Sequence, residues 1–189
     1  ALQQSAATNA GVAVAAFDID RFRSLNVEHG AEFAEDLIRQ VGSVLVRTFG
    51  ENCLIGRHTV DEFLVICMGA SAANAPHLAE TARREVESLV LRPLNVEENF
   101  YVHPTVSAGV ALYPADAATR VELLHKAAES LQRAKQTGKN QVCLAADTEM
   151  VPKSIRITKA QLIKLAELSS TSGRPETILL REALDDLFY

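Results

Sequence analysis

Two apolar runs with only four residues between them constrain the fold of this chain more than any other feature. Residues 53–58 and 63–68 are rich in Cys, Leu, Ile, Val and Phe, and Thr59, Val60, Asp61 and Glu62 separate them. Apolar runs of this length are typical of strands, and so short a connection predicts a β-hairpin. The hairpin has residues 59–62 at its tip.

Strand and helix patterns alternate over the rest of residues 11–145. Residues 11–17 are a short apolar run of the kind found in buried strands, residues 100–113 predict a strand or hairpin arm, and residues 141–145 predict a closing strand. Apolar residues at helical spacing predict a long helix from Asn26 onward and helices over 72–91 and 120–137. Gly138 ends the last of these as a C-cap glycine.

Size and charge limit the classes of protein to which the chain can belong. Its 189 residues suffice for one mid-sized domain and a small appendage, and its net charge of −5 argues against a protein that coats nucleic acid with its whole surface. No apolar run approaches the roughly 20 residues that a membrane-spanning helix needs, so we expect a cytoplasmic protein without a membrane segment in this chain. Because the chain starts at Ala1 without a signal-peptide pattern, we expect a processed or cloned boundary and a missing upstream region.

The three cysteines are far apart in the sequence. Cys53, Cys67 and Cys143 each lie in an apolar stretch. This pattern predicts buried thiols in a reducing cytosol.

Acidic residues gather at two places that the expected fold can bring together. Asp18 and Asp20 leave the first strand two residues apart, so their carboxylates are expected on one face, and Asp61 and Glu62 lie at the hairpin tip. Clustered carboxylates repel one another unless a cation compensates them, and hard oxygen ligands of this kind suit Mg²⁺ together with phosphates. Either pair alone is equally well explained as surface acids.

Four segments in order resemble the GGDEF domain, the fold of the diguanylate cyclases. They are FDIDRFRSLN at 17–26, RHTVDEF at 57–63, TVSAGVA at 105–111 and AKQTGKN at 134–140. They are similar to the family's D-x-D-x-F-K-x-x-N opening, its R-x-G-G-D-E-F hairpin, its T-V-S-x-G-V-A strand and its A-K-x-x-G-R-N segment. The resemblance covers about residues 11–145 and implies an α+β fold with a central, mostly antiparallel sheet, like the palm of nucleotidyl cyclases.

The resemblance also implies roles for particular residues. Asp18, the carbonyl of Ile19 and Asp61 would hold Mg²⁺ with Glu62 beside them, and Asp61 and Glu62 would be the catalytic residues, here vestigial. The expected nucleotide-binding residues are Arg23, Asn26, Glu35, Lys135 and Lys139, with Asn26 and Glu35 at the guanine edge and the basic residues at the triphosphate.

The departures from the family pattern point to lost chemistry. Thr59 and Val60 stand in place of the two signature glycines. A tight hairpin favours positive φ at its centre, which β-branched residues resist, and branched side chains obstruct a phosphate that would approach the backbone. The family's inhibitory R-x-x-D site is replaced by GENC at 50–53, so binding of cyclic di-GMP in the usual inhibitory mode is not expected.

The end of the chain resembles a ribbon-helix-helix module. Residues 1–146 form the expected GGDEF domain, 147–152 a linker with Pro152, and 153–189 a β-α-α tail. Within the tail, alternation predicts a strand over 153–158, and helical spacing predicts helices over 159–172 and 177–188.

The ribbon-helix-helix resemblance implies a homodimer whose paired strands enter the major groove of duplex DNA. Ser154, Arg156 and Thr158 would face outward from the strand toward the DNA. The tail carries six basic and six acidic residues over 149–189, however, so a dimerisation clasp without DNA is the alternative.

Three functions follow in order of preference. The first is a non-enzymatic signalling regulator with a degenerate GGDEF domain and a dimerising, DNA-binding tail. The second is a weak or atypical diguanylate cyclase that makes cyclic di-GMP from GTP with Mg²⁺. The third is an interaction scaffold in cyclic di-GMP signalling, with or without bound guanine nucleotide.

Overall fold

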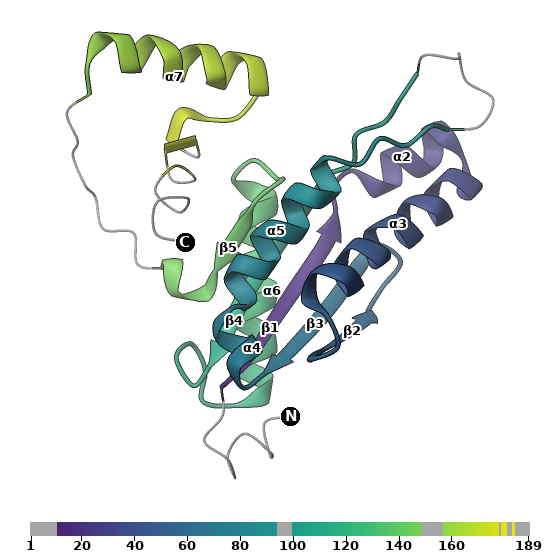
Figure 1. Ribbon diagram of the computed structural model, residues 1–189, viewed down its shortest axis with the longest axis vertical. Coiled ribbons are helices and arrows are strands. Elements are labelled where there is room, and N and C mark those ends of the chain that lie inside the picture. The colour runs from purple at the N-terminus through teal and green to yellow at the C-terminus, as the bar shows by residue number, and fades with distance from the viewer. Residues whose placement is uncertain (1–10, 94–99, 149–156, 178, 181–182, 184–189) are drawn as a thin grey trace. The chain divides into compact units, whose positions relative to one another are not determined.

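The computed structural model describes residues 11–93, 100–148, 157–177, 179–180 and 183 (Figure 1). The chain divides into two compact units, Ala1–Thr148 and Glu149–Tyr189, and each is described by itself.

The first unit is built on one five-stranded sheet with the order β2-β3-β1-β4-β5. The central strand β1 is antiparallel to β3 on one side and to β4 on the other, β2 is antiparallel to β3, and β5 is parallel to β4. The strands are β1 (Val12–Ile19), β2 (Cys53–Arg57), β3 (Glu62–Met68), β4 (Val106–Tyr113) and β5 (Val142–Leu144). The expected α+β class with a mostly antiparallel sheet is therefore confirmed.

Helices cover both faces of this sheet. Figure 1 shows α3 and α5 on one face and α6 on the other. The helices of this unit are α2 (Phe22–His29), α3 (Ala31–Phe49), α4 (Ala70–Ala73), α5 (Ala75–Glu87) and α6 (Arg120–Gln136), and a 3₁₀ turn, η1 (Ala145–Thr148), follows β5.

The central strand is buried along its whole length because both of its faces are covered. Phe17 and Ile19 belong to the apolar cluster under α3 and α5, whereas Val12 and Val14 belong to the cluster under α6. Gly109 of β4 lies directly against the backbone of α6, where a Cβ atom would overlap main-chain atoms. The buried strand ends at Asp18 and Ile19, and this end positions the candidate site.

Several elements differ in extent from the sequence prediction. The helix expected from Asn26 onward is two helices, separated at Gly30 with φ 86°, a conformation that favours glycine. The helix expected over 72–91 is divided at Asn74 into α4 and α5, and it ends at Glu87. The strand expected over 100–113 starts at Val106, because Val102 makes an isolated bridge with Leu91 instead of joining the sheet.

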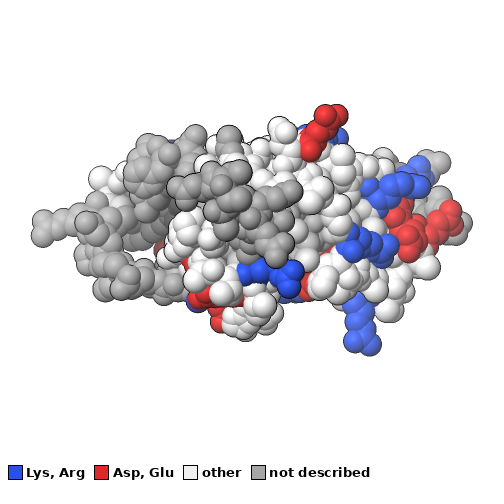
Figure 2. All heavy atoms as spheres, turned by 90° about the horizontal axis from the view of Figure 1, so that it is seen from below, with Lys and Arg blue, Asp and Glu red and all other residues white. Residues whose placement is uncertain are grey.

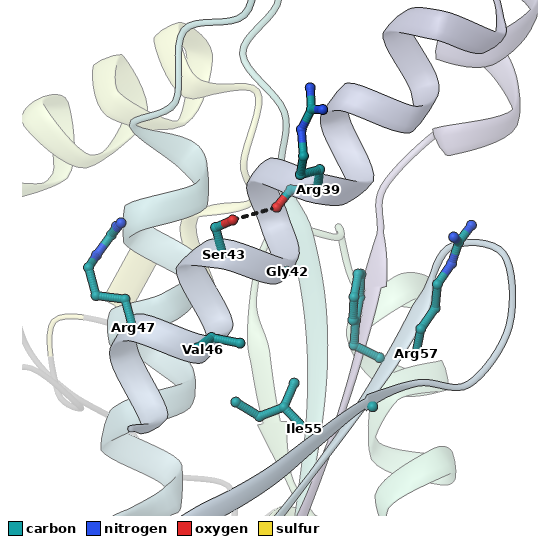
Figure 3. Close-up of a pocket in the computed structure, with 9 residues that line it drawn as sticks. Arg39, Gly42, Ser43, Val46, Arg47, Ile55 and Arg57 are labelled. Atoms are coloured by element: carbon teal, nitrogen blue, oxygen red, sulfur yellow. Dashed lines mark hydrogen bonds between the residues drawn. The ribbon is translucent and has the colours of Figure 1, made fainter. Parts of the chain in front are cut away.

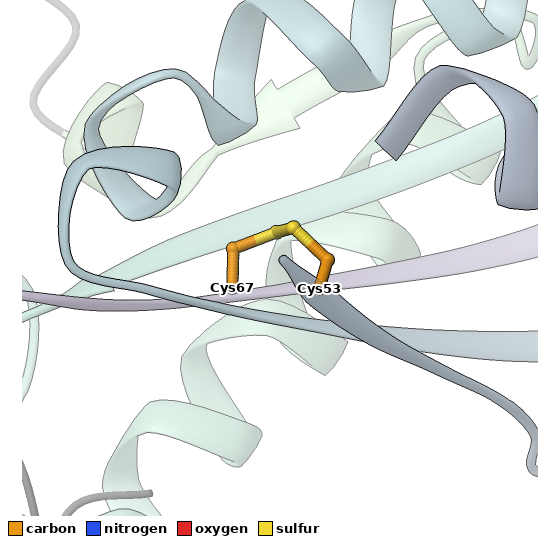
Figure 4. The surroundings of a disulfide bond; sticks show 2 residues. All are labelled: Cys53 and Cys67. Atoms are coloured by element: carbon orange, nitrogen blue, oxygen red, sulfur yellow. A yellow bond between two sulfur atoms is a disulfide. The ribbon is translucent and has the colours of Figure 1, made fainter. Parts of the chain in front are cut away.

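The prediction of three buried thiols was wrong for two of them. Cys53 of β2 and Cys67 of β3 form a disulfide (Figure 4). They are register partners with their Cα atoms 4.4 Å apart, the separation of a pair that shares no backbone hydrogen bonds and whose side chains lie close together. Their spacing along the chain does not reveal this pairing, because the hairpin register produces it. Cys143 of β5 is buried and lies outside the disulfide.

The second unit contains α7 (Lys159–Ser172), whose bounds match the predicted helix. Thr158 caps it: its side chain accepts a hydrogen bond from the Gln161 amide, and the Gln161 side chain accepts one from the Thr158 amide. Ile157 and Thr158, the described end of the expected strand 153–158, are not in a strand, and Ser154 and Arg156 lie outside the described residues. Of the expected helix 177–188, residues 177, 179–180 and 183 are described, and they are helical.

None of the helices within the described ranges is both long and apolar enough to cross a membrane.

Candidate functional site

The expected acidic residues meet where β1 ends beside the β2–β3 hairpin. Asp18 is the register partner of Glu62, and the Ile19 amide donates a hydrogen bond of 3.1 Å to the Asp61 carbonyl. Asp18 is buried, whereas Asp61 and Glu62 are half-buried. Residues that are far apart in sequence thus lie near one another, and the charges of Asp61 and Glu62 act on Asp18.

Lys135 reaches this group from the last turn of α6. Its Nζ lies 2.6 Å from Oδ2 of Asp18. Burial raises the pKa of Asp18 from 3.8 to about 6; the hydrogen bond and charge of Lys135 lower it, and the negative charges of Asp61 and Glu62 raise it. The ion pair with Lys135 therefore offsets only part of the free-energy cost of burying the ionised form of Asp18.

Asp20 does not join this group, although the strand spacing placed it beside Asp18. Its carboxylate accepts hydrogen bonds from Thr105 Oγ1 at 2.8 Å, Ser107 Oγ at 2.7 Å and the backbone N–H of Asn140 at 3.0 Å. Three donors to one buried carboxylate give it a structural role. It ties the end of β1 to the residues that follow α6.

The turn after α6 has an unusual backbone that this network holds. Lys139 and Asn140 have positive φ values of 64° and 47°, which are uncommon outside glycine. The Asn140 side chain accepts a 2.8 Å hydrogen bond from Arg83 and donates one of 2.7 Å to Glu87, both from α5. The Lys139 amide donates to the Ala134 carbonyl at 2.9 Å. The turn that carries Lys139 is thereby fixed to α5 and to β1.

Sequence reasoning missed Arg83, which is 4% exposed. Its guanidinium also bonds Glu80 and Glu87 at 2.8 Å and 2.7 Å. Burial lowers its pKa, but the hydrogen bonds and charges of these two carboxylates outweigh burial and hold the pKa above its ordinary value. The signal was present in the sequence, since Arg83 interrupts the apolar face of a helix that includes Ala79 and Val86.

The hairpin tip differs from the expectation of a strained turn. His58, Thr59, Val60 and Asp61 connect β2 to β3, and Thr59 and Val60 are absent from the described residues with positive φ. The connection of four residues is long enough to turn without left-handed backbone. Arg57 holds it by donating to the carbonyls of Thr59 and Val60 at 2.7–3.1 Å. The strain argument against these residues is therefore wrong. The steric argument stays a prediction, and both side chains are exposed, Val60 at 61%.

The remaining nucleotide-binding candidates lie on two helices. Arg23 and Asn26 are exposed on α2, and Glu35 is exposed on α3. Val27, which follows Asn26, is 81% exposed.

A divalent metal does not fit the carboxylates as they are arranged. Among the residues that the structure describes, no three His, Cys, Asp or Glu side chains are grouped so that they could hold a metal ion. The ammonium group of Lys135 already lies on Asp18, the residue expected to be the main ligand. The expected Mg²⁺ set of Asp18, Ile19, Asp61 and Glu62 is thus near the right place without the required geometry.

A groove of about 500 Å³ lies between α3 and β2 (Figure 3). Gly42, Ile55 and Phe63 are among its lining residues, and Arg39, Arg47 and Arg57 line it as well. Arg39 is ion-paired with Asp36 and Arg47 with Glu85. Sequence analysis did not anticipate this groove.

Charge is mixed on the surface in view in Figure 2. Basic and acidic side chains are interspersed there among uncharged ones.

Comparison with known proteins gives one consistent family. The sequence model for "Diguanylate cyclase, GGDEF domain" matches residues 1–141. MucR of Pseudomonas aeruginosa, a bifunctional diguanylate cyclase/cyclic di-GMP phosphodiesterase, is 29% identical over 143 residues, which are 76% of this chain and 20% of MucR. Diguanylate cyclase A of Treponema denticola is 26% identical over 128 residues, 68% of this chain and 33% of that protein. This chain therefore spans a third or less of the length of these two relatives.

Solved structures give the same fold. The GGDEF domain of DgcB from Caulobacter crescentus, solved in complex with c-di-GMP, superposes with a TM-score of 0.70 at 25% identity and covers 77% of this chain and 84% of that chain. The GGDEF domain of TpbB from Pseudomonas aeruginosa superposes with a TM-score of 0.70 at 27% identity and covers 77% of this chain and 83% of that chain.

Proposed function

Because this chain belongs to the GGDEF diguanylate cyclase family, we propose that it is a non-enzymatic regulator in cyclic di-GMP signalling that has kept the cyclase scaffold and lost GTP turnover. The observation that carries the proposal is the pair Thr59 and Val60 at the hairpin tip.

The hairpin supports loss of turnover through steric obstruction. Two exposed branched side chains stand where glycines would let a phosphate approach the backbone amides. The bonds from Arg57 to both carbonyls hold the tip in this form, so a large rearrangement would have to break them. Moreover, among the residues that the structure describes, no three Asp, Glu, His or Cys side chains are grouped so that they could hold a metal ion, and metal-assisted phosphoryl transfer depends on such an ion.

Incubation of the purified chain with GTP and Mg²⁺ tests the proposal. We expect no cyclic di-GMP above the background of the Asp61→Ala variant. Multiple turnovers per protein, abolished by Asp61→Ala, would refute it and favour the weak cyclase. As a companion test, Thr59→Gly with Val60→Gly should strengthen binding of Mg²⁺·GTP if the side chains are what obstruct the site.

Residual nucleotide binding is a separate part of the proposal. Asp18, Asn26, Asp61, Lys135 and Lys139 are retained, so we expect guanine nucleotide to bind weakly or not at all. Calorimetric titration measures this, and a submicromolar dissociation constant would contradict it.

We also propose that the tail dimerises the chain. Helix α7 exposes the apolar side chains of Leu162, Ile163 and Leu168 at 49%, 60% and 59%, and a partner would bury some of them. A truncated chain that ends at residue 148 should therefore be a monomer by light scattering, whereas the full chain should be a dimer. A dimeric truncated chain would refute the role of the tail.

DNA binding by the paired tails is the last part of the proposal, and it rests on the ribbon-helix-helix resemblance of residues 153–189. If Arg156 contacts a base, Arg156→Ala should weaken specific binding by about 1–3 kcal/mol, while Lys159→Ala should mainly reduce the salt dependence. Thr158 is a weaker candidate than Ser154 or Arg156, because its hydroxyl is engaged in the cap of α7. A dimer that never retains duplex DNA at about 50 mM salt, where phosphate contacts are strong, would leave the interaction scaffold as the function.

A further inference from the structure

Strand β2 forms one edge of the sheet, and no strand lies on its outer side among the residues that the structure describes. The His58 amide donates a 2.8 Å hydrogen bond to the Glu62 carbonyl, so His58 and every second residue before it bond to the β3 side. Ile55 and Arg57 are the residues between, and their backbone N–H and C=O groups therefore point toward the free edge. Such a row of backbone groups is a template for one more strand.

The groove between α3 and β2 follows the same edge. Only residues 50–52 connect the two elements, so they run in opposite directions, with Arg47 nearer the start of β2 and Arg39 nearer its end. The floor of the groove is open at Gly42, in the middle of α3. A Cβ atom on Gly42 would lie 3.5 Å from the ring of Phe63, an ordinary contact, so it is the missing side chain that leaves this space.

The groove is basic, although the chain as a whole is acidic. Its nine lining residues include three arginines and no Asp or Glu, whereas the chain has a net charge of −5 (Figure 3). Arg57 donates to carbonyls of the hairpin tip, so Arg39 and Arg47 are the two arginines that can face a partner. Their ion pairs with Asp36 and Glu85 are exposed and contribute little, so a carboxylate of the partner can replace either acid.

A second copy of this chain fits the edge poorly. Two β2 strands paired antiparallel would be related by a two-fold axis perpendicular to the sheet, so both α3 helices would lie on the same face. The arginines of the two grooves would then face one another, and like charges at a strand junction destabilise it. The same charges favour an acidic segment.

We propose that the free edge of β2 and the groove bind an extended acidic segment of a partner protein, which adds to the sheet as one further strand. Arg39 and Arg47 are separated by about 12 Å along the helix, and positions i and i+4 of a strand are about 14 Å apart. The segment therefore has acidic residues at i and i+4 and an apolar residue at i+2, which lies against Ile55 and the open floor at Gly42. This surface does not include the carboxylates, so the inference does not depend on whether the chain turns over GTP.

Peptide binding to the full chain, with its disulfide oxidised, tests the inference by fluorescence anisotropy. The probe is a labelled peptide Gly-Glu-Thr-Val-Thr-Glu-Gly, which has the acidic and apolar residues at the required spacing, and we expect saturable binding. Replacing both glutamates of the peptide by lysine should weaken binding about tenfold or more, because the charge-assisted hydrogen bonds are lost. N-methylation of the central valine should also weaken it about tenfold, because the valine N–H can no longer pair with the Ile55 carbonyl.

Variants of the chain test the two halves of the surface. Gly42→Leu fills the groove without changing charge, and Arg39→Gln combined with Arg47→Gln removes both cations; each should weaken binding about tenfold. Ile55→Pro removes an outward N–H that β3 does not use, and it should weaken binding to a similar degree. The matched control is Arg120→Gln on α6, which covers the other face of the sheet and should bind within about twofold of the wild type.

Four results would overturn the inference. The first is no binding of the glutamate peptide to the wild type at about 1 mM, a concentration at which even a weak complex is seen. The second is equal binding of the N-methylated peptide, which uses the wild-type protein and so does not depend on a variant that folds. The third is unchanged binding to both groove variants, since the peptide would then bind elsewhere. The last is a dimer that Ile55→Pro dissociates while the peptide does not bind, because a second copy would then occupy the edge.

Discussion

Replacement of Asp18 by asparagine should stabilise the folded protein at neutral pH. The pKa of Asp18 lies at about 6 against 3.8 in an unfolded chain, chiefly because the side chain is buried. The folded state therefore holds its ionised form at a cost. An asparagine has nearly the same shape, carries no charge, and can still accept a hydrogen bond from Lys135.

The size of the effect follows from the pKa difference. About two pKa units correspond to about 3 kcal/mol, which is the upper limit for the gain at pH 8. Between pH 4 and pH 6 the folded protein keeps a proton on Asp18 that the unfolded chain has released. Stability from this group is therefore present at low pH and is lost as the pH rises through about 6. The advantage of Asp18→Asn should accordingly shrink by about 1.5 kcal/mol when the pH falls from 8 to 5.

Urea unfolding of both proteins at pH 8 and pH 5, with the disulfide kept oxidised, measures these quantities. The control is Asp36→Asn, which breaks the exposed ion pair with Arg39 and should change stability by less than about 1 kcal/mol at either pH. The reasoning is refuted if Asp18→Asn is less stable than the wild type at pH 8, or if its advantage does not depend on pH. In either case the folded state does not hold the ionised form of Asp18 at a cost.

Three further substitutions probe the scaffold around the site. Gly109→Ala should lower the free energy of unfolding by about 3 kcal/mol or more, because the new Cβ would overlap the backbone of α6; a loss below about 1 kcal/mol in urea unfolding would show that the helix can move away. Cys67→Ser should cost about 2–4 kcal/mol relative to the oxidised wild type and leave Cys53 as a thiol, and reduction should bring the wild type close to the variant; equal stability before reduction would contradict the disulfide. Arg83→Lys should cost about 2 kcal/mol, because an ammonium group keeps the charge but lacks the planar geometry that serves both glutamates and Asn140, and amide exchange at Asn140 should quicken; unchanged exchange would remove Arg83 from the network.

The local pattern of apolar and polar residues was sufficient to predict most of the helices and strands. The alternation of apolar runs and amphipathic segments predicted the hairpin of β2 and β3, and the bounds of α7 agree with the prediction. These elements are predictable because strand and helix periodicities record which side of each element is buried. The prediction treated two helices as one at Gly30 and again at Asn74. At both places the apolar spacing continues along the sequence although the helix is interrupted in the structure.

The motif residues of the candidate site were also found from sequence, but their partners were not. Asp18, Asp61, Glu62 and Lys135 were each singled out, and the structure brings them together. That Lys135 lies on Asp18 depends on how α6 docks onto β1. This packing of α6 against β1 cannot be predicted from the spacing of residues in the sequence.

Three other features were decided by tertiary structure alone. Asp20 belongs to the same motif as Asp18, yet its carboxylate accepts hydrogen bonds from three donors in distant segments. Cys53 and Cys67 pair because the hairpin register places them opposite each other. The hairpin tip avoids the expected positive φ because its connection has four residues and Arg57 braces it. Sequence by itself determined which residues carry charge and which faces are apolar, whereas register and helix docking decided which charges meet, because both depend on contacts between segments far apart in the chain.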